Sequence, residues 1–580
     1  MTIDLEKIKS PADLKKIPQD QLPLLSEELR GHLMAKLAAH GGHVGPNLGV
    51  VEATVALHYV FDAPKDEIVF DVSHQSYVHK MLTGRIDAFL DPAKYDDVSG
   101  YTCPEESPEY DLFEIGHTST SISLANGLAK ARDLEGGKQN VVAFIGDAAL
   151  GGGMALEGLD YGPELHSNLI IILNDNQMSI AENHGELYNH LRTLRESNGT
   201  APNNIFKALG YEYVYVEEGN DVEQLIKAFR RVKDADHAVL VHINTMKGMG
   251  LPVAETNKEK FHWSVPFDLQ SGTPSHISNA ETYVSLFTEH MMKKMREDKT
   301  VVTMTAGTPG AIGFSALDRK ESGRQFVDVG IAEQNCVTMA AGLAKGGAKP
   351  LMGVMATFIQ RAYDQISHDI AINNLPVVIV DFSGSVFGIN DMTHLGFFDV
   401  AMISNIPNIL MIAPATKEEY LAMIDWALEQ RERPVVIRTA SGPVISSDRP
   451  VNMDFTKYDI VREGKDVAII GEGYMLQTAL KAADLLKEKG VDATVINPRL
   501  LSGVDAETLD KLAGYKKVIT IDDGIIDGAM GQKIAAYLAT KGVPTVCVGL
   551  KKEFADRYDP QELLKANGMT PEQIAELIVN

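Results

Sequence analysis

Two short apolar runs, each followed at once by polar residues, constrain the fold of this chain more than any other feature. They cover residues 141–145 and 169–173 and consist mainly of branched side chains. Runs of this length and composition are typical of parallel strands that are buried on both faces of a sheet. The stretch 141–180 therefore predicts a strand, a loop, a helix, a second strand and a second loop, as in an α/β fold.

The two loops that follow these strands carry oxygen ligands. Asp147 follows the first run, and Asn176 and Met178 follow the second. Ligands of an open α/β sheet bind outside the carboxyl ends of its strands, so we expect the two loops to converge. The two side chains and the Met178 carbonyl are hard donors suited to Mg²⁺, which usually keeps water and phosphate ligands as well. Taken alone, either loop could equally be an ordinary turn at a strand end.

The pair of loops is more specific than either loop, and it carries a resemblance to a known family. Asp147 and Asn176 lie 29 residues apart, a spacing similar to that of the thiamin diphosphate motif. Residues 41–85, 116–133 and 357–372 resemble the transketolase-like thiamin diphosphate enzymes, and most closely the 1-deoxy-D-xylulose-5-phosphate synthases. The resemblance implies a transferase of aldehyde or ketone groups with thiamin diphosphate and Mg²⁺ as cofactors, a transketolase-like fold, and a role in isoprenoid precursor biosynthesis.

Several residues are assigned to the cofactor diphosphate by this resemblance. The three glycines at 151–153 would let backbone amides approach the phosphates at the start of a helix. Ala148 replaces the last glycine of the motif, and a methyl group is tolerated there only if φ is negative. Lys247, between a strand end and a glycine, would face the diphosphate, although a solvated lysine is the alternative. The other residues implied at the cofactor are His117, Ser119 and Ala149, with helix capping by Thr118 or Ser119 as an alternative for that loop.

Two residues of the second half match the part of the family site that binds the aminopyrimidine ring. Glu333 lies at the start of a predicted helix and matches the glutamate that shares a proton with N1′ of that ring. An acidic residue at a helix N-terminus is also favourable for electrostatic reasons alone. Phe358 matches the aromatic residue that stacks on the pyrimidine, although a lone phenylalanine is more often a core residue.

Four histidines are candidates for moving substrate protons. His43, His74, His262 and His394 match cavity residues of the family, where a neutral imidazole can accept or donate a proton. Without the resemblance, each would more often be a structural hydrogen-bonding residue. None of the histidine spacings is typical of a helical zinc site. His40 and His79 receive no assignment.

The sequence departs from the resemblance at the end of the site that would bind the acceptor. Ser383 and Ser441 stand where the family has two arginines that bind the phosphate of glyceraldehyde 3-phosphate. Each charge-assisted hydrogen bond to phosphate is worth about 1.5–3 kcal/mol, so losing two should weaken acceptor binding about a hundredfold or more. We therefore expect an acceptor other than glyceraldehyde 3-phosphate. Further departures are Met355, Asn390 and Asn335.

Nearby cations could compensate in part for the missing arginines. Arg361, Arg438 and His394 are the candidates, but Arg361 could equally pair with Asp364 or Asp369. Two other functions stay open: a transketolase-type transfer of two carbons from an unusual ketose, and a catalytically silent paralogue that serves in binding or assembly.

Alternating strand-like and helix-like segments predict three domains. They cover 1–270, which would bind the diphosphate and Mg²⁺, 280–445, which would bind the pyrimidine, and 455–580, a C-terminal transketolase-like domain. The leucines from 22 to 37 have helical spacing. Residues 181–206 are polar and predict a mobile connection. The sequence GEGYML after a strand at 466–470 is only a weak dinucleotide-loop signal.

Bulk properties limit the partners. The net charge of −25 argues against nucleic-acid binding. No apolar run reaches eighteen residues and the first residues lack a signal-peptide pattern, so we expect no membrane span and a cytoplasmic protein. Three scattered cysteines suggest neither a zinc site nor a disulfide framework. The expected partners are small substrates, namely a 2-oxo acid or ketose donor and an aldehyde acceptor, and the resemblance implies a homodimer.

Overall fold

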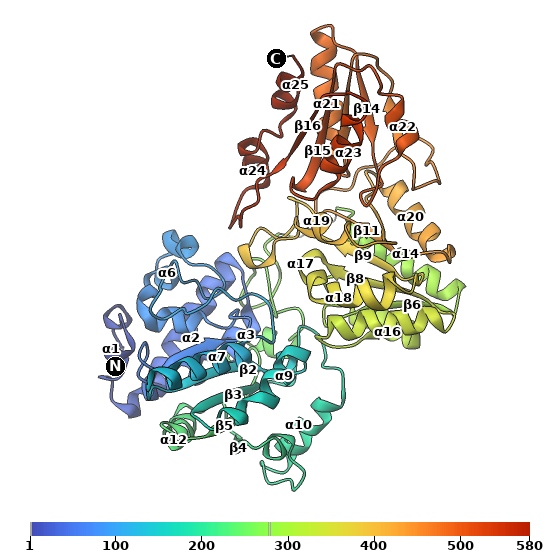
Figure 1. Cartoon of the computed structure of the whole chain (residues 1–580). Helices are drawn as coiled ribbons and strands as arrows, with labels where there is room; N and C mark the ends of the chain where they lie inside the picture. Colours follow the sequence, from blue (N-terminus) through green and yellow to red (C-terminus); the bar gives the residue numbers. More distant parts are fainter. Residues whose placement is uncertain (1–2, 277, 279, 580) are drawn as a thin grey trace. The chain divides into compact units, whose positions relative to one another are not determined.

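The computed structural model describes residues 3–276, 278 and 280–579 of the 580-residue chain. It divides into two compact units. The first consists of Met1–Ser278 with the short segment Gly330–Ala332, and the second of Asn279–Val329 with Glu333–Asn580. Each unit is built from strands that alternate with helices, so the predicted α/β class is confirmed (Figure 1).

The first unit contains one five-stranded sheet in the order β1-β2-β3-β5-β4, and all of its neighbouring strands are parallel. The two strands predicted first are β2 and β3 at its centre, and the register places Gly146 beside Asn174. Both loops therefore leave the same edge of the sheet. The strand bounds are β1 (Glu67–Phe70), β2 (Val141–Gly146), β3 (Leu169–Asp175), β4 (Glu212–Val216) and β5 (Ala238–Asn244).

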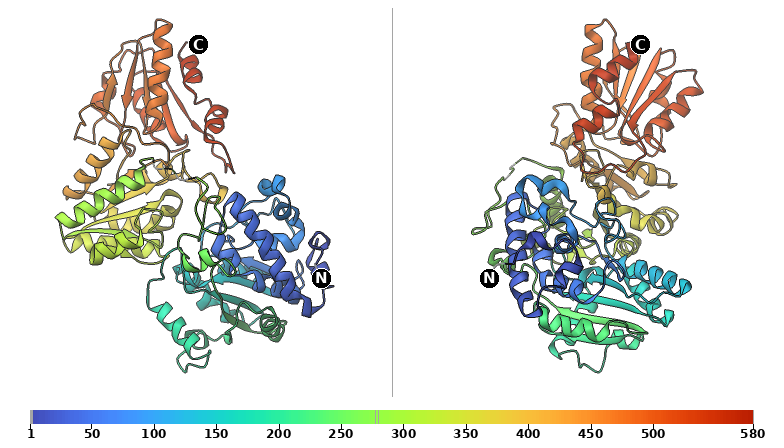
Figure 2. Two further views of the ribbon diagram at one scale, coloured as in Figure 1. Left: turned by 180° about the vertical axis from the view of Figure 1, so that it is seen from behind. Right: turned by 90° about the vertical axis from the view of Figure 1, so that its left-hand side faces the viewer.

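Alternate residues of these strands face two separate hydrophobic cores. Phe144 and Ile170 pack with the leucine-rich helix α2 (Leu22–His40) and with α4 (Val51–Val60) and α12 (Val222–Val232). Val141 and Ile171 pack on the opposite face with α7 (Ser121–Glu135) and α9 (Gly153–Tyr161). Figure 2 shows helices on both faces from two further sides. Burial on both faces explains why the strand sequences are continuously apolar.

The segment 181–206 is not the unstructured connection that its polar composition predicts. It contains α10 (Glu186–Glu196), an amphipathic helix, and it leads into α11 (Ile205–Ala208). Leu191 and Leu194 of α10 are 1% and 0% exposed and belong to the core on the α7 and α9 face. Two buried leucines at helical spacing thus outweighed the polar composition of the segment.

The second unit contains two sheets. The first has six parallel strands in the order β10-β11-β9-β8-β6-β7. The other has five strands in the order β12-β14-β13-β15-β16, in which only β12 runs antiparallel to its neighbour. The bounds in the first sheet are β6 (Val301–Thr305), β7 (Phe326–Asp328), β8 (Lys349–Met355), β9 (Val378–Phe382), β10 (Leu410–Ile412) and β11 (Val435–Arg438), and in the second β12 (Asp459–Arg462), β13 (Val467–Gly471), β14 (Ala493–Asn497), β15 (Lys517–Ile525) and β16 (Thr545–Leu550).

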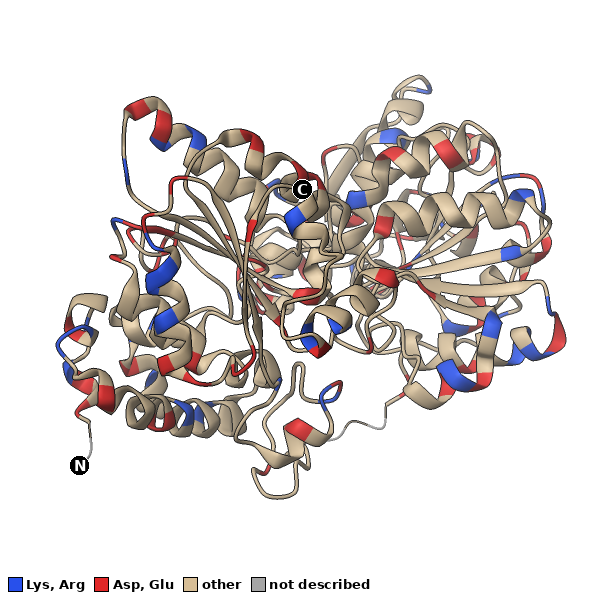
Figure 3. Ribbon diagram, turned by 90° about the horizontal axis from the view of Figure 1, so that it is seen from below, with Lys and Arg blue, Asp and Glu red and all other residues tan. Residues whose placement is uncertain are grey.

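Acidic and basic residues lie mostly on the helices and loops that surround these sheets, as Figure 3 shows. The largest helices of the second unit are α14 (Tyr283–Glu297), α16 (Glu333–Lys345), α20 (Lys417–Glu429) and α21 (Met475–Glu488). In the part of the chain that the structure describes, no helix combines the length and the apolar character needed to cross a bilayer.

Candidate cofactor and active site

The loops after β2 and β3 present the oxygen atoms that the sequence predicted. Asp147 begins the short helix α8 (Asp147–Leu150), and its Oδ2 accepts a hydrogen bond of 2.7 Å from Asn183 Nδ2. Asn176 is 7% exposed, and its Oδ1 is buried without a hydrogen-bond partner among the residues that the structure describes. Between Asn176 and Met178 the chain turns at Gln177, where φ is 64°. A buried amide oxygen without a donor is the kind of group that a cation satisfies, so these residues fit Mg²⁺.

The charges around Asp147 also fit a cation. Burial, and then the nearby charge of Asp175, raise the pKa of Asp147 to about 7. Burial lowers the pKa of Lys247 to about 7, and Lys247 is 1% exposed. The lysine is therefore not the solvated side chain of the alternative interpretation. A divalent cation at Asp147 would favour the ionised carboxylate and remove the electrostatic cost of its burial.

The glycine-rich turn after α8 is shaped for close approach. Ala148 lies within α8 and has no positive φ, so its methyl group is tolerated as the sequence analysis required. A Cβ atom at Gly152 would lie 2.2 Å from Ser119 Oγ, and one at Gly151 would lie 2.5 Å from the hydroxyl of Tyr188. Helix α9 begins at Gly153 directly after this turn. A side chain at 152 would overlap Ser119, so glycine is favoured there for steric reasons, whereas at 151 only the end of the Tyr188 side chain would have to move.

The loop before α7 is held by a residue that the sequence analysis did not single out. Both oxygens of the Asp71 carboxylate accept backbone hydrogen bonds, from Ser119 N at 2.7 Å and from Ser121 N at 2.9 Å. Ser119 has a φ of 72° and donates through Oγ to Ala149 O at 2.7 Å. The N-cap position is Thr120, so the alternative interpretation of this loop, a cap at Thr118 or Ser119, is wrong. Ser119 and Ala149, both predicted at the cofactor, thus lie in contact, and His117 precedes them in the same loop.

Three of the four predicted histidines form one cluster in the first unit. The ring centroids of His43 and His74 lie 5.0 Å apart, and His262 lies 5.7 Å and 5.4 Å from them. Lys247 Nζ approaches His262 Nδ1 at 3.0 Å and donates to Ser179 O at 2.5 Å. Burial, followed by the charge of Lys247, lowers the pKa of His262 well below its usual value. His262 therefore stays neutral at physiological pH and suits proton exchange with a substrate.

The residues matched to the pyrimidine side belong to the second unit. Glu333 is the first residue of α16 and is 5% exposed, and burial raises the pKa of its carboxyl. Arg361 Nη1 lies 4.0 Å from Glu333 Oε2, a pairing that the sequence analysis did not consider among the partners of Arg361. Phe358 contacts His394 edge to face, with ring centroids 5.6 Å apart. The structure thus pairs Glu333 with Arg361 and Phe358 with His394.

The two serines that replace arginines lie side by side. Ser383 Oγ and Ser441 Oγ are 2.5 Å apart and share a hydrogen bond. An aromatic pair adjoins them: Ser441 N donates to Phe387 O at 2.6 Å, and the Phe387 ring lies 4.5 Å from that of Tyr474. Tyr474 belongs to the sequence GEGYML, which therefore contributes an aromatic ring that packs on Phe387.

Arg438 does not compensate for the missing arginines, because its guanidinium already donates hydrogen bonds to carboxylates. It is 3% exposed and donates through Nε to Asp399 Oδ2 at 2.6 Å. It also donates through Nη1 to Glu472 Oε1 at 3.3 Å and through Nη2 to Asp523 O at 2.6 Å. These acidic neighbours raise the pKa of the guanidinium above its ordinary value. The expectation that Arg438 could bind a phosphate is therefore wrong.

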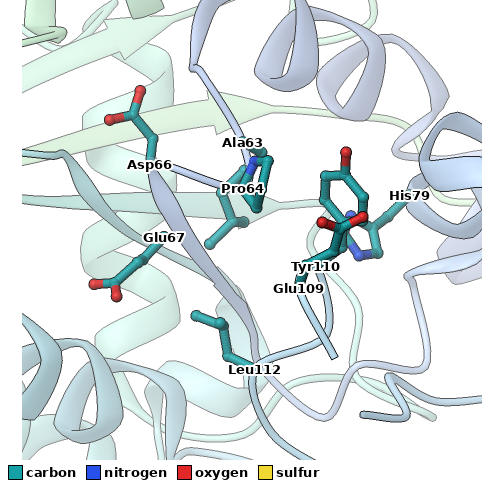
Figure 4. A pocket seen from close by; sticks show the side chains of 9 residues that line it. Ala63, Pro64, Asp66, Glu67, His79, Glu109, Tyr110 and Leu112 are labelled. Atoms are coloured by element: carbon teal, nitrogen blue, oxygen red, sulfur yellow. The ribbon is translucent and has the colours of Figure 1, made fainter. Parts of the chain in front are cut away.

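The two unassigned histidines have structural partners. His40 Nε2 lies 2.6 Å from Asp96 Oδ1 at the surface. His79 is fully buried, with Nδ1 2.9 Å from His58 Nε2 and Nε2 2.8 Å from Asp111 Oδ1. His79 also borders a cavity of about 10 Å³, in which Figure 4 shows Pro64 and Tyr110 among the lining residues. A cavity of that size holds about one water molecule, so it is not a substrate site.

Sequence family models match three successive parts of the chain. The model described as 1-deoxy-D-xylulose-5-phosphate synthase matches residues 5–201 and 196–245. The model described as transketolase, pyrimidine binding domain, matches residues 280–443, and that described as transketolase, C-terminal domain, matches residues 456–574. Together these matches extend over most of the chain.

Curated relatives match over almost the whole length. The 1-deoxy-D-xylulose-5-phosphate synthase of Symbiobacterium thermophilum is 39% identical and the match covers 99% of this chain and 94% of the relative. That of Clostridium tetani is 37% identical, with 99% of each chain covered. A solved transketolase from Campylobacter jejuni matches over both full lengths at 15% identity with a TM-score of 0.46. Since that structural score is low, the assignment rests on the sequence matches.

Proposed function

The chain belongs to the 1-deoxy-D-xylulose-5-phosphate synthase family, and from this we propose that it decarboxylates pyruvate and transfers the remaining two-carbon unit to an aldehyde. The family and the transketolase domains make it a thiamin diphosphate-dependent transferase with Mg²⁺. The observation that carries the proposal is the pair of loops at Asp147 and Asn176, which offers buried oxygen donors at one sheet edge.

In the proposed site, the first unit holds the charged part of the cofactor. Asp147, Asn176 and the Met178 carbonyl bind the metal ion, and Lys247 and His117 bind the diphosphate. Backbone groups at Ala148 and Ala149 and the side chain of Ser119 complete this part of the site. Support comes from the buried orphan oxygen of Asn176 and from the contact between Ser119 and Ala149.

Bound thiamin diphosphate supplies a carbon nucleophile that can attack a carbonyl and stabilise the resulting negative charge. Glu333 would lie at the aminopyrimidine of the bound cofactor and share a proton with it, and burial raises the pKa of its carboxyl. Phe358 would stack on the ring. His43, His74, His262 and His394 move substrate protons, and the low pKa of His262 keeps its imidazole available as an acceptor.

We infer that the acceptor carries no phosphate at the end of the site formed by Ser383 and Ser441. Two hydroxyl groups that bond each other at 2.5 Å offer neutral hydrogen bonds and no positive charge. Arg438, the buried cation of this region, is already neutralised by carboxylates. The Phe387 and Tyr474 rings fit a neutral carbon chain or hydroxylated group better than a dianion.

Steady-state rates with pyruvate and paired aldehydes test this assignment. Each acceptor is offered with and without a terminal phosphate, for example glyceraldehyde and glyceraldehyde 3-phosphate. We expect the free aldehyde to have the higher kcat/KM, and we expect the double variant S383R/S441R to reverse that preference. A kcat/KM for glyceraldehyde 3-phosphate equal to that for the free aldehyde would exclude the neutral acceptor.

Two other functions give different results in simple assays. A transketolase-type enzyme would transfer two carbons from a ketose and release no CO₂ from pyruvate. A silent binding paralogue, which Asn335 at a family histidine position keeps in view, would bind cofactor without exchanging its C2 proton. Release of labelled CO₂ together with exchange at C2 supports the synthase-type reaction over both.

We further propose that the chain works as a cytoplasmic homodimer with three functional domains at 1–270, 280–445 and 455–580. Three sheets, one in each of these segments, support the domain boundaries. Exposed apolar side chains in both units support self-association. These are Met154, Leu156 and Tyr161 in the first unit and Met339, Tyr363 and Ile372 in the second.

A further inference from the structure

The segment that follows β3 is fastened to the two loops of the proposed metal site. Asn183 Nδ2 donates to Asp147 Oδ2 at 2.7 Å, and the hydroxyl of Tyr188 donates to the carbonyl of Ala148 at 3.3 Å. Further along, Arg195 forms an ion pair with Asp175. Residues 183–195 therefore contact the chain at the carboxyl ends of both β2 and β3, and we call them the strap.

Asn183 is the residue of the strap that touches a proposed metal ligand. Its Nδ2 group is committed to Asp147, while its Oδ1 atom is buried and has no hydrogen-bond partner among the described residues. Because both atoms are attached to one carbon, the orphan oxygen lies beside the same carboxylate. Asn176 Oδ1 is the other buried amide oxygen without a partner at this sheet edge. Two unsatisfied oxygens next to one carboxylate are costly unless a cation or its bound water is present.

We propose that Asn183 is a positioning residue of the metal site. Its hydrogen bond fixes the rotation of the Asp147 carboxylate, and its free oxygen accepts a hydrogen bond from a water molecule on the metal ion. Mg²⁺ keeps several such waters, and groups that orient metal ligands in this way commonly account for about 10- to 100-fold in metal affinity. The inference rests on the proposed function, because it takes Asp147 as a metal ligand.

The helix that follows explains how Asn183 is held in place. Leu191 and Leu194 of α10 are buried in the core, and the exposed residues of the same helix are polar. The backbone carbonyl of His184 also lies 3.4 Å from the position of a Cβ atom built at Gly330. A side chain that lies shortly before a helix anchored in the core loses less entropy when it is ordered, which suits a positioning role.

Metal binding by N183A tests the proposal. The dissociation constant of Mn²⁺ is measured by electron paramagnetic resonance at saturating thiamin diphosphate, and that of thiamin diphosphate by calorimetry at saturating Mg²⁺. We expect N183A to bind Mn²⁺ about 10- to 100-fold more weakly, while its affinity for thiamin diphosphate at saturating Mg²⁺ stays within about threefold. The matched control is N189A, because Asn189 is an exposed strap residue whose side chain donates to Glu186 Oε2 at 3.0 Å and not to a proposed metal ligand; it should change neither constant.

A second variant separates positioning from loosening of the strap. L191A removes buried side-chain volume from α10 but leaves Asn183 intact, and trypsin cleavage at Arg192 and Arg195 reports on the helix. We expect L191A to speed cleavage and to keep most of the Mn²⁺ affinity, whereas N183A should show the opposite pattern. An unchanged Mn²⁺ constant in N183A, or an equal loss in L191A, would overturn the positioning role. If the unaltered protein binds neither Mn²⁺ nor cofactor, the proposed function fails as well.

Discussion

At the scale of single residues, the site depends on side chains whose charge is set by burial. Glu333 is the clearest case, because its carboxyl is almost completely buried and its pKa is raised, while Arg361 opposes the shift from 4.0 Å. A carboxyl group with a raised pKa holds its proton more readily than an exposed one and can still exchange it, which an amide cannot do.

Replacing Glu333 by glutamine should therefore slow proton exchange at C2 of the bound cofactor. General acid–base groups contribute about 10²- to 10⁴-fold, and we expect a loss in that range with little change in cofactor affinity. Deuterium exchange followed by NMR measures the rate. E321Q, at an exposed glutamate, is the matched control. Exchange by E333Q at the rate of the unaltered protein would show that another group promotes proton exchange at C2.

Individual site residues differ in how far the sequence could predict them. Asp147 and Asn176 were predictable because strand ends, spacing and residue type all pointed to one edge of the sheet. Asn183 and Asp71 were not, since a single Asn or Asp in a polar loop has many possible partners. Their hydrogen bonds to Asp147 and to the α7 backbone depend on contacts 36 and 48 residues away.

At the scale of secondary-structure elements, the start of α9 must approach the α7 loop closely. A Cβ atom at Gly152 would come within 2.2 Å of Ser119 Oγ, whereas one at Gly153 would meet nothing within 4 Å. The two neighbouring glycines are therefore a matched pair for substitution.

The variant G152A should lower the free energy of unfolding by about 1–3 kcal/mol, as overpacked sites commonly do. G153A should leave it unchanged or raise it by up to about 1 kcal/mol, because alanine favours a helix over glycine. Chemical denaturation of both variants gives the comparison. Equal losses of unfolding free energy in the two variants would mean that the start of α9 shifts to accommodate an added methyl group.

Most elements were predictable from apolar runs, and the misses have physical reasons. The strands predicted at 141–145, 169–173 and 466–470 all occur, with ends shifted by one or two residues. No strand was predicted at β4, β11, β12 or β16. The half-buried residues of β4, β12 and β16 interrupt the apolar pattern, whereas β11 is buried throughout but only four residues long. Helix α10 was missed because only one narrow side of it is apolar, so its overall composition resembles that of a loop.

At the scale of the whole chain, a buried charge cluster joins two sheets of the second unit. Asp381, Asp399 and Arg438 come from the six-stranded part, and Glu472 and Asp523 come from the C-terminal part. All five are at most 3% exposed. One guanidinium lies within 4.0 Å of three carboxyl groups, and the charge of Asp399 also acts on Asp381, so several of these groups must be protonated or strongly stabilised by hydrogen bonds.

Replacing Arg438 by methionine should destabilise the second unit by about 3–5 kcal/mol, because it leaves carboxylates buried without their cation. Scanning calorimetry resolves the transition of this unit. R449M, at a half-exposed arginine that pairs with Asp459, should cost less than about 1 kcal/mol. A similar shift in both variants would contradict the special role of the buried arginine.

The same cluster predicts a pH dependence of stability. Burial raises the pKa of Glu472 to about 8 and that of neighbouring Asp522 to about 7, and it raises the pKa of Asp381 well above its usual value. The folded state therefore holds protons that the unfolded chain releases near pH 4. The contribution of these groups is fully present below about pH 4 and is lost as the pH rises toward 7 to 8.

Denaturant unfolding of the second unit should accordingly show a free energy that falls between pH 5 and pH 8. The double variant E472Q/D522N removes two of the responsible groups and should flatten this slope. A slope that persists unchanged in the double variant would assign the effect to other groups.

The Arg438 cluster also limits where the polypeptide could be truncated. A product ending near residue 450 would keep Asp381, Asp399 and Arg438 but lose the carboxylate of Glu472 and the carbonyl of Asp523 that hold the guanidinium. Water would then reach groups that are buried in the full-length chain, and the shortened protein would be prone to precipitate. The last fifth of the polypeptide is thus needed to keep this cluster buried, and shortened forms for crystallisation or engineering should retain it.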